Sequence, residues 1–97
     1  MPKLIALWTA PDDVEGFTAD YTATHARLVR SMPELTDAFF GTSLGGPYAR
    51  IAKLTWSSGE DMNAALGSPQ GAELMADTQR LQETFGNRVD VLIVNED

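Results

Sequence analysis

The order of its segments constrains the fold of this chain more than any single motif. Short apolar runs, too short for helices, alternate with longer stretches of helical spacing. The resulting order is strand, helix, strand, strand, helix, strand, which is typical of the ferredoxin-like βαββαβ sandwich of the α+β class. We expect strands at residues 3–9, 35–42, 48–57 and 88–95, a helix at 14–32, and a second helical region in two pieces, 60–66 and 70–82.

The first helix carries the only histidine of the chain on its predicted inward face. Phe17, Tyr21, Leu28 and Met32 recur at steps of four, seven and four, the spacing of one helical face. His25 falls in the same stripe. An imidazole in an apolar stripe is either held by a hydrogen bond or used in chemistry, so His25 is the leading candidate for a functional site.

Composition and charge exclude several classes of protein. The 97 residues predict one domain spanning 1–97, and 43% hydrophobic and 22% charged residues are ordinary for a globular protein. The net charge of −7 repels phosphate backbones and anionic lipid, so we expect neither nucleic acid nor a membrane as partner. The apolar run near the N-terminus is too short for a signal peptide or a membrane span, which favours a cytoplasmic protein.

Two strands carry apolar residues on both faces, although helices cover only one face of such a sheet. In the third strand Leu54 and Trp56 alternate with Ala49 and Ile51, and the last strand has the same two-sided pattern. A large apolar sheet face is unusual on the surface of a monomer. We therefore expect a homodimer with the two outer sheet faces packed together.

Three sequence segments resemble the EthD family. The helix has the series Phe17-x3-Tyr21-x3-His25-x2-Leu28-Val29-Arg30-x2-Pro33-x-Leu35, the third strand opens with Gly46-Pro47-Tyr48, and the second helical region contains Ala65-Leu66-x-Ser68-Pro69-x-Gly71. The first strand, LIALW, also fits the opening of that family. The signature often continues with glycine after the proline, where this chain has Glu34.

The resemblance implies a dimeric α+β barrel, in which two ferredoxin-like sheets pack into one barrel. Relatives in that superfamily include lactone isomerases, polyketide cyclases and cofactor-free monooxygenases that act on small ring compounds. Many EthD-like proteins have no assigned reaction, so the resemblance implies a class of protein and not a substrate.

The candidate site residues are those able to move a proton or hold a ring compound. His25 is the candidate general acid or base, because imidazole titrates near neutrality. A purely structural histidine, bonded to a backbone carbonyl, is the alternative. Tyr21 and Tyr48 have hydroxyls that can orient a ligand oxygen or pair with His25.

Aromatic and charged strand residues complete the candidate set. Trp8, Phe39, Phe40 and Trp56 can line a flat apolar cavity, although strand aromatics more often belong to a core or an interface. Arg50 alternates onto the side of Tyr48 and can bind a ligand carboxylate. One histidine, no cysteine and scattered carboxylates give no metal cluster and no phosphate loop, so we expect no metal and no cofactor.

Two functions follow from these observations. In the first, the protein is a small cofactor-independent enzyme of secondary-metabolite or xenobiotic metabolism, similar to an isomerase, cyclase or monooxygenase, with His25 as acid or base on an apolar ring compound. In the second, it is a non-catalytic accessory or binding protein that supports a neighbouring oxygenase. A cavity that reaches His25 distinguishes the first from a closed interior.

Overall fold

The computed structural model describes residues 1–96 and confirms the ferredoxin-like α+β fold. Four antiparallel strands form one sheet in the order β2-β3-β1-β4. The strands are β1 (Pro2–Thr9), β2 (Leu35–Thr42), β3 (Tyr48–Trp56) and β4 (Val89–Asn95). The helical segments are α1 (Val14–Asp20), η1 (Tyr21–His25), α2 (Ala26–Arg30), α3 (Gly59–Leu66) and α4 (Pro69–Phe85).

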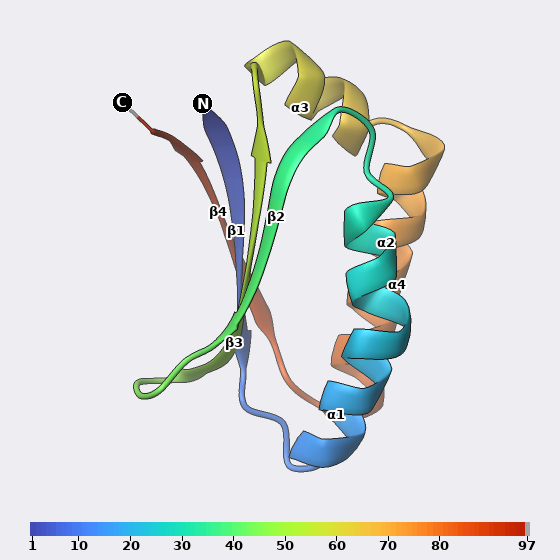
Figure 1. Cartoon of the computed structure of the whole chain (residues 1–97). Coiled ribbons are helices and arrows are strands. Elements are labelled where there is room, and N and C mark those ends of the chain that lie inside the picture. The colour runs from blue at the N-terminus through green and yellow to red at the C-terminus, as the bar shows by residue number, and fades with distance from the viewer. Residues whose placement is uncertain (97) are drawn as a thin grey trace.

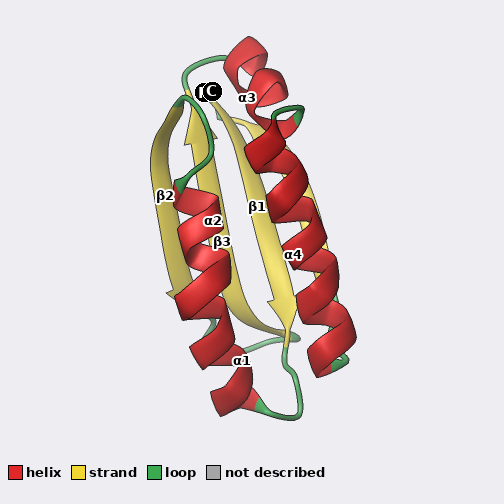
Figure 2. Cartoon of the chain, turned by 90° about the vertical axis from the view of Figure 1, so that its right-hand side faces the viewer, coloured by secondary structure: helices red, strands yellow, loops and turns green. Residues whose placement is uncertain are grey.

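The helices form one layer against one face of the sheet. Figure 1 shows the twisted sheet on one side and the helices on the other. Turned by 90°, the run from α1 to α2 and helix α4 lie side by side across the strands, with α3 at one end (Figure 2). No helix within residues 1–96 is long and apolar enough to cross a membrane.

The first helix is continuous but contains a wider turn. Segments α1, η1 and α2 follow without a break, and η1 is π-helical. Phe17, Tyr21, His25 and Val29 are buried at steps of four, a spacing that an α-helix of 3.6 residues per turn cannot keep on one face. The wider turn keeps them aligned. The predicted inward position of Leu28 is therefore wrong: it is half-buried, and Val29 takes its place in the core.

Side-chain caps begin the three predicted helical regions. The Asp13 carboxylate accepts from the backbone N–H of Gly16 at 2.9 Å, and the Ser58 and Ser68 hydroxyls accept from residues three positions later. Helix α4 extends three residues beyond the predicted end at residue 82 and stops at Gly86, which has φ 66°. That left-handed conformation suits glycine at a helix C-terminus.

The turn into β2 holds a non-glycine residue in the same left-handed region. Glu34 has φ 59°, at the position where the resembled signature often has glycine. Beside it, the indole N–H of Trp56 donates to the Pro33 carbonyl at 3.0 Å. Trp56 is fully buried, so it fixes the end of the helix against β3.

The predicted alternation of β3 fails at its first residue. A register shift between Trp8 and Thr9 inserts an extra residue in β3, so Tyr48 changes sides. The Tyr48 hydroxyl donates to Asp90 at 2.7 Å, and Asp90 pairs with Leu7 on the face away from the helices. Arg50 stays on the helix side. Tyr48 and Arg50 thus lie on opposite faces of the sheet.

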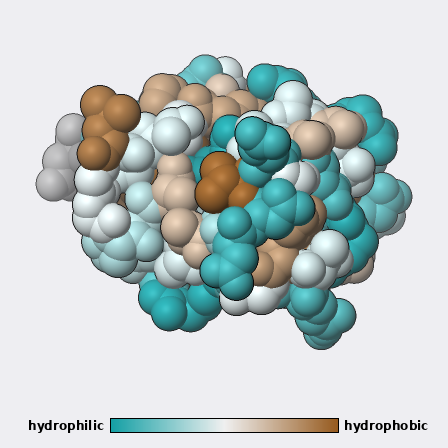
Figure 3. All heavy atoms as spheres, turned by 90° about the horizontal axis from the view of Figure 1, so that it is seen from below, coloured by the Kyte–Doolittle hydropathy of each residue, from teal (hydrophilic) through white to brown (hydrophobic). Residues whose placement is uncertain are grey.

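The outer face of the sheet mixes apolar side chains, which the two-sided strand patterns predicted, with charged ones at Lys3, Lys53 and Asp90. Leu92 and Val94 alternate with the helix-side residues of β4 and are exposed, as is Phe39 on β2. Seen from below, hydrophilic residues are most numerous on the helix-bearing side of the molecule (Figure 3).

Candidate active site

A cavity of about 390 Å³ lies between the helix layer and the sheet and reaches His25. Its floor is the inner face of β1, β3 and β4, where Ala6 and Ala52 are register partners with small side chains. Met75 of α4 and Val91 of β4 border the cavity and are exposed, so the cavity opens between these two elements. Its lining is Leu4, Ala6, Trp8, His25, Val29, Ala52, Leu54, Leu66, Gly71, Leu74, Met75, Thr78, Val89 and Val91.

His25 is held from behind by a carboxylate on the other helix. Its Nδ1 lies 2.9 Å from Oδ2 of Asp77, and both side chains are more than nine-tenths buried. Among residues 1–96, the hydrogen bond of the imidazole is the one at Nδ1. Because an ionised carboxylate only accepts, Nδ1 donates its proton to Asp77 in the neutral imidazole, and Nε2 keeps its lone pair.

The environment favours the neutral form of the imidazole. Burial lowers the pKa of His25 below its ordinary value, although the hydrogen bond and the charge of Asp77 act in the opposite direction. The nearby charge of Arg80 lowers the pKa of His25 further. A histidine of this kind is unprotonated at neutral pH and ready to accept a proton at Nε2.

Asp77 is itself held by a second ion pair. Arg80 Nε donates to Oδ1 of Asp77 at 2.7 Å, so the two oxygens of this carboxylate have different partners. The other edge of the guanidinium donates to both oxygens of Asp20, at 2.7 and 2.9 Å. The hydrogen bond of Asp20 with Arg80 lowers the pKa of the Asp20 carboxyl. The chain of contacts joins α4 to α1.

Aromatic rings surround the imidazole. The ring of Trp8 meets His25 edge to face at a centroid distance of 5.3 Å, and the ring of Tyr21 lies 5.1 Å away. Burial raises the pKa of Tyr21 to about 12, and its hydroxyl has no hydrogen-bond partner among residues 1–96. Arg50 places its guanidinium 4.7 Å from the centre of the Tyr21 ring.

Of the residues predicted for the site, the structure brings His25 and Trp8 to the cavity. Tyr21 packs against His25 but does not line the cavity, and Arg50 stacks on Tyr21. Three other predicted residues do not reach the cavity. Tyr48 and the half-exposed Phe39 are on the outer face, and Trp56 is bonded to Pro33.

Asp77 is the residue that sequence reasoning missed. In the sequence of the last helix, Leu74, Thr78 and Leu81 fall on one helical face, and Asp77 lies three residues after the first of these and four before the last. A carboxylate in an apolar stripe was therefore a usable signal. With His25 placed in the facing stripe of the other helix, the same rule pairs them.

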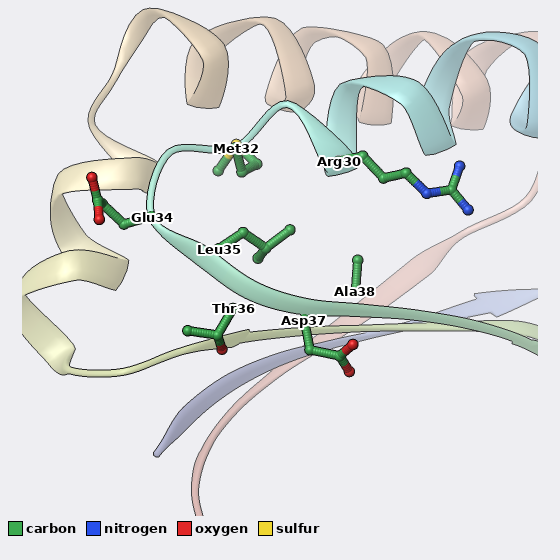
Figure 4. A pocket seen from close by; sticks show the side chains of 7 residues that line it. All are labelled: Arg30, Met32, Glu34, Leu35, Thr36, Asp37 and Ala38. Carbon is green, nitrogen blue, oxygen red and sulfur yellow. The ribbon is translucent and has the colours of Figure 1, made fainter.

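A second hollow of about 410 Å³ lies at the turn between α2 and β2. Figure 4 shows its lining, in which Arg30 extends from the helix end past Ala38, and Glu34 and Asp37 lie along the turn and strand. The charged groups are exposed, and none resembles the buried pair at His25. Among residues 1–96 no group of three or more histidine, aspartate and glutamate side chains could hold a metal ion.

Comparison with known proteins gives a fold and no sequence family. No family model matches the sequence, and no curated protein matches it. The structure superposes on an ethyl tert-butyl ether D (EthD) family protein from Bacillus halodurans with a TM-score of 0.91 and 24% identity, covering 100% of this chain and 99% of that one. The chain has the fold of an EthD-family protein.

Two further solved structures are more distantly similar. A variant of SnoaB, a cofactor-independent oxygenase from Streptomyces nogalater, superposes with a TM-score of 0.72 at 12% identity, covering 98% of this chain and 91% of that one. HapK from Hahella chejuensis also has a TM-score of 0.72, at 13% identity, covering 100% of this chain and 93% of that one. The EthD-like fold is thus shared with proteins whose sequences differ widely.

Proposed function

We propose that this EthD-like chain is a small cofactor-independent enzyme in which His25 acts as general base and acid on an apolar ring compound. The observation that carries the proposal is the His25–Asp77 pair at the wall of an apolar cavity. A positioned base contributes typically 10²- to 10⁴-fold to the rate of a proton transfer. The likeness to a cofactor-independent oxygenase supports the same class of enzyme.

The roles of the residues follow from their contacts. His25 Nε2 removes a proton from an acidic C–H or O–H of the ligand, and the Asp77 carboxylate stabilises the imidazolium that forms. Returning this proton to another atom of the ligand isomerises it or closes a ring. Tyr21 supports the imidazole ring, and Trp8 provides a flat apolar wall beside it.

The cavity favours a particular class of ligand. Aliphatic side chains from the sheet and from α4 form most of its surface, and His25 is the ionisable residue among those that line it. We infer a neutral aromatic or alicyclic compound with a carbonyl or hydroxyl group. A secondary metabolite or a xenobiotic of this kind fits, and a compound with several phosphates does not.

Non-catalytic binding is the alternative, and the same cavity supports it. An apolar space lined by few polar groups can hold a ring compound for a neighbouring oxygenase without reacting with it. We also propose a homodimer formed through the apolar outer sheet face and, from the sequence, a cytoplasmic setting. The two functions differ only in what His25 does to the bound compound.

Exchange of ligand hydrogens in D₂O separates the two functions. Phenols, cyclic ketones and lactones are first screened for binding by quenching of tryptophan fluorescence. Bound compounds are then followed by NMR for deuterium uptake at acidic carbon atoms. We expect the wild-type chain to accelerate uptake and His25→Gln to lose the acceleration by 10²-fold or more while still binding.

The control is Arg27→Gln, which changes an exposed side chain of α2. Equal exchange by the wild type and His25→Gln would contradict an acid–base role. Binding with neither exchange nor turnover in the wild type would favour the non-catalytic function.

A further inference from the structure

We infer that Arg80 is a positioning residue for His25: by joining Asp77 to Asp20 it fixes the carboxylate that holds Nδ1, so that Nε2 is the nitrogen presented to the cavity. The inference deepens the proposed function and rests on it for its biological meaning. Its physical content, the state of one imidazole, can be measured without any reaction.

The hydrogen bonds of Asp77 and Arg80 are the first support for a positioning role of Arg80. A carboxylate bonded only to His25 could rotate about its side-chain torsions and lose the alignment of the imidazole. Asp77 is instead gripped at Oδ1 by Arg80 Nε at 2.7 Å, which leaves Oδ2 for His25. Arg80 cannot easily follow a rotation because both of its terminal nitrogens are bonded to Asp20.

The balance of charges around His25 is the second support for this role of Arg80. The charged groups facing the imidazole are Asp77 and Arg80 from α4 and Asp20 from α1, while the sheet presents the uncharged ring of Trp8. Without Arg80, two carboxylates would face the imidazole with no compensating cation. Protonation of His25 would then become more favourable, and the ring would no longer be a free base at the same pH.

Exposure separates Arg80 from the core residues. Its side chain is 41% exposed, whereas Asp77 is 7% exposed, so a change at Arg80 removes contacts without opening a hole in the interior. The fold therefore should survive the substitution. Arg80 acts on His25 through Asp77, and it is not among the residues that line the cavity.

The test uses the only histidine of the chain as its own probe. Ring ¹⁵N chemical shifts of His25 report its tautomer and its titration in the full-length protein. We expect the wild type to show the Nδ1-protonated tautomer at neutral pH. In Arg80→Gln we expect a mixture of tautomers and a titration midpoint displaced upward by half a unit or more.

Arg80→Lys keeps the charge but loses the planar two-sided grip, so it should restore the midpoint and only part of the tautomer preference. Arg27→Gln is the control for loss of a helical arginine. An unchanged midpoint and tautomer in Arg80→Gln would overturn the inference, even if the variant melts at a lower temperature. If His25→Gln keeps full activity while Arg80→Gln shifts the titration, the proposed function fails and the inference about Arg80 stands.

Discussion

Asp77 lies 2.9 Å from His25 although 52 residues separate the two in the sequence. Each side chain belongs to a different helix, and both are buried. The pair therefore exists only when α4 is docked beside the first helix. Chemistry at His25 and the packing of the two helices depend on the same contact.

Removing the Asp77 charge should affect both stability and chemistry. Asp77→Asn keeps the size of the side chain but replaces an oxygen that accepts hydrogen bonds by an amide nitrogen that donates. Leaving a buried partner poorly bonded costs about 1–3 kcal/mol in the free energy of unfolding, and any His25-dependent rate should fall. Chemical unfolding and deuterium exchange measure the two effects. Glu73→Gln, on an exposed position one turn earlier, should change neither.

The stability of the protein should fall at mildly acidic pH because of His25. Burial lowers the pKa of folded His25 below the value of about 6.5 that it has when unfolded. The unfolded chain therefore binds more protons, so stability decreases as pH falls below about 6.5 and levels off below the folded pKa. Urea unfolding from pH 8 to pH 5 measures this slope.

His25→Gln is the control, since it removes the titrating group and leaves the carboxylates. The difference in slope between the two proteins isolates the histidine from the acidic groups that titrate lower. A steeper loss of stability in His25→Gln would show that the sign is reversed.

Replacing Glu34 should stabilise the fold. A left-handed backbone conformation costs a residue with a Cβ atom roughly 1–2 kcal/mol relative to glycine, and Glu34 has φ 59°. Glu34→Gly should raise the free energy of unfolding by about 1 kcal/mol, or the melting temperature by about 4–8 °C. Glu34→Ala, which keeps the strain, should give no such gain; equal melting temperatures for the two variants would contradict the argument.

Filling the cavity should prevent ligand binding without disturbing the His25–Asp77 pair. Ala52 and its register partner Ala6 leave the space above the sheet open. Ala52→Leu places three more carbon atoms there, so ring compounds should bind at least tenfold more weakly, measured by fluorescence quenching. The tautomer of His25 should stay unchanged. Ala76→Leu, on the exposed side of α4, should leave binding intact.

A charge on the outer sheet face should disrupt the proposed dimer. Leu92 is 50% exposed in the isolated chain and lies on the face that we expect to pack against a second copy. Leu92→Asp would bury two like charges near each other, which is unfavourable. Sedimentation at micromolar concentration should show a dimer for the wild type and a monomer for the variant. Leu44→Asp, in the exposed hairpin loop, should remain a dimer.

Most of the fold could be predicted from the sequence, because each segment has one dominant pattern of apolar and polar residues. Alternation in β3 and the apolar runs of β1 and β4 place these strands within a few residues of their observed ends. Two details depend on tertiary structure. The bulge that moves Tyr48 to the outer face is set by pairing with β1, and the wide turn before Ala26 is set by packing of the rings.

The candidate site was less predictable than the fold. His25 stood out as a lone imidazole in an apolar stripe, and Trp8 as an aromatic residue in a buried strand. Asp77 gave an equally clear pattern but had to be paired with a residue on another helix. Arg80 and Asp20 are partly exposed surface residues whose pairing no periodicity indicates.

The π-helical turn at η1 gives the first helix one residue more than an ideal α-helix would use over the same length. Deleting one residue between Tyr21 and His25 would change the steps between the buried positions to four, three and four, which an ordinary α-helix keeps on one face. Val29 would then stay inward without the wide turn. The turn thus joins two α-helical segments whose residue numbering is offset by one position. Backbone amides at this junction should exchange with solvent deuterium sooner than those of α4, because the regular ladder of α-helical hydrogen bonds is interrupted there.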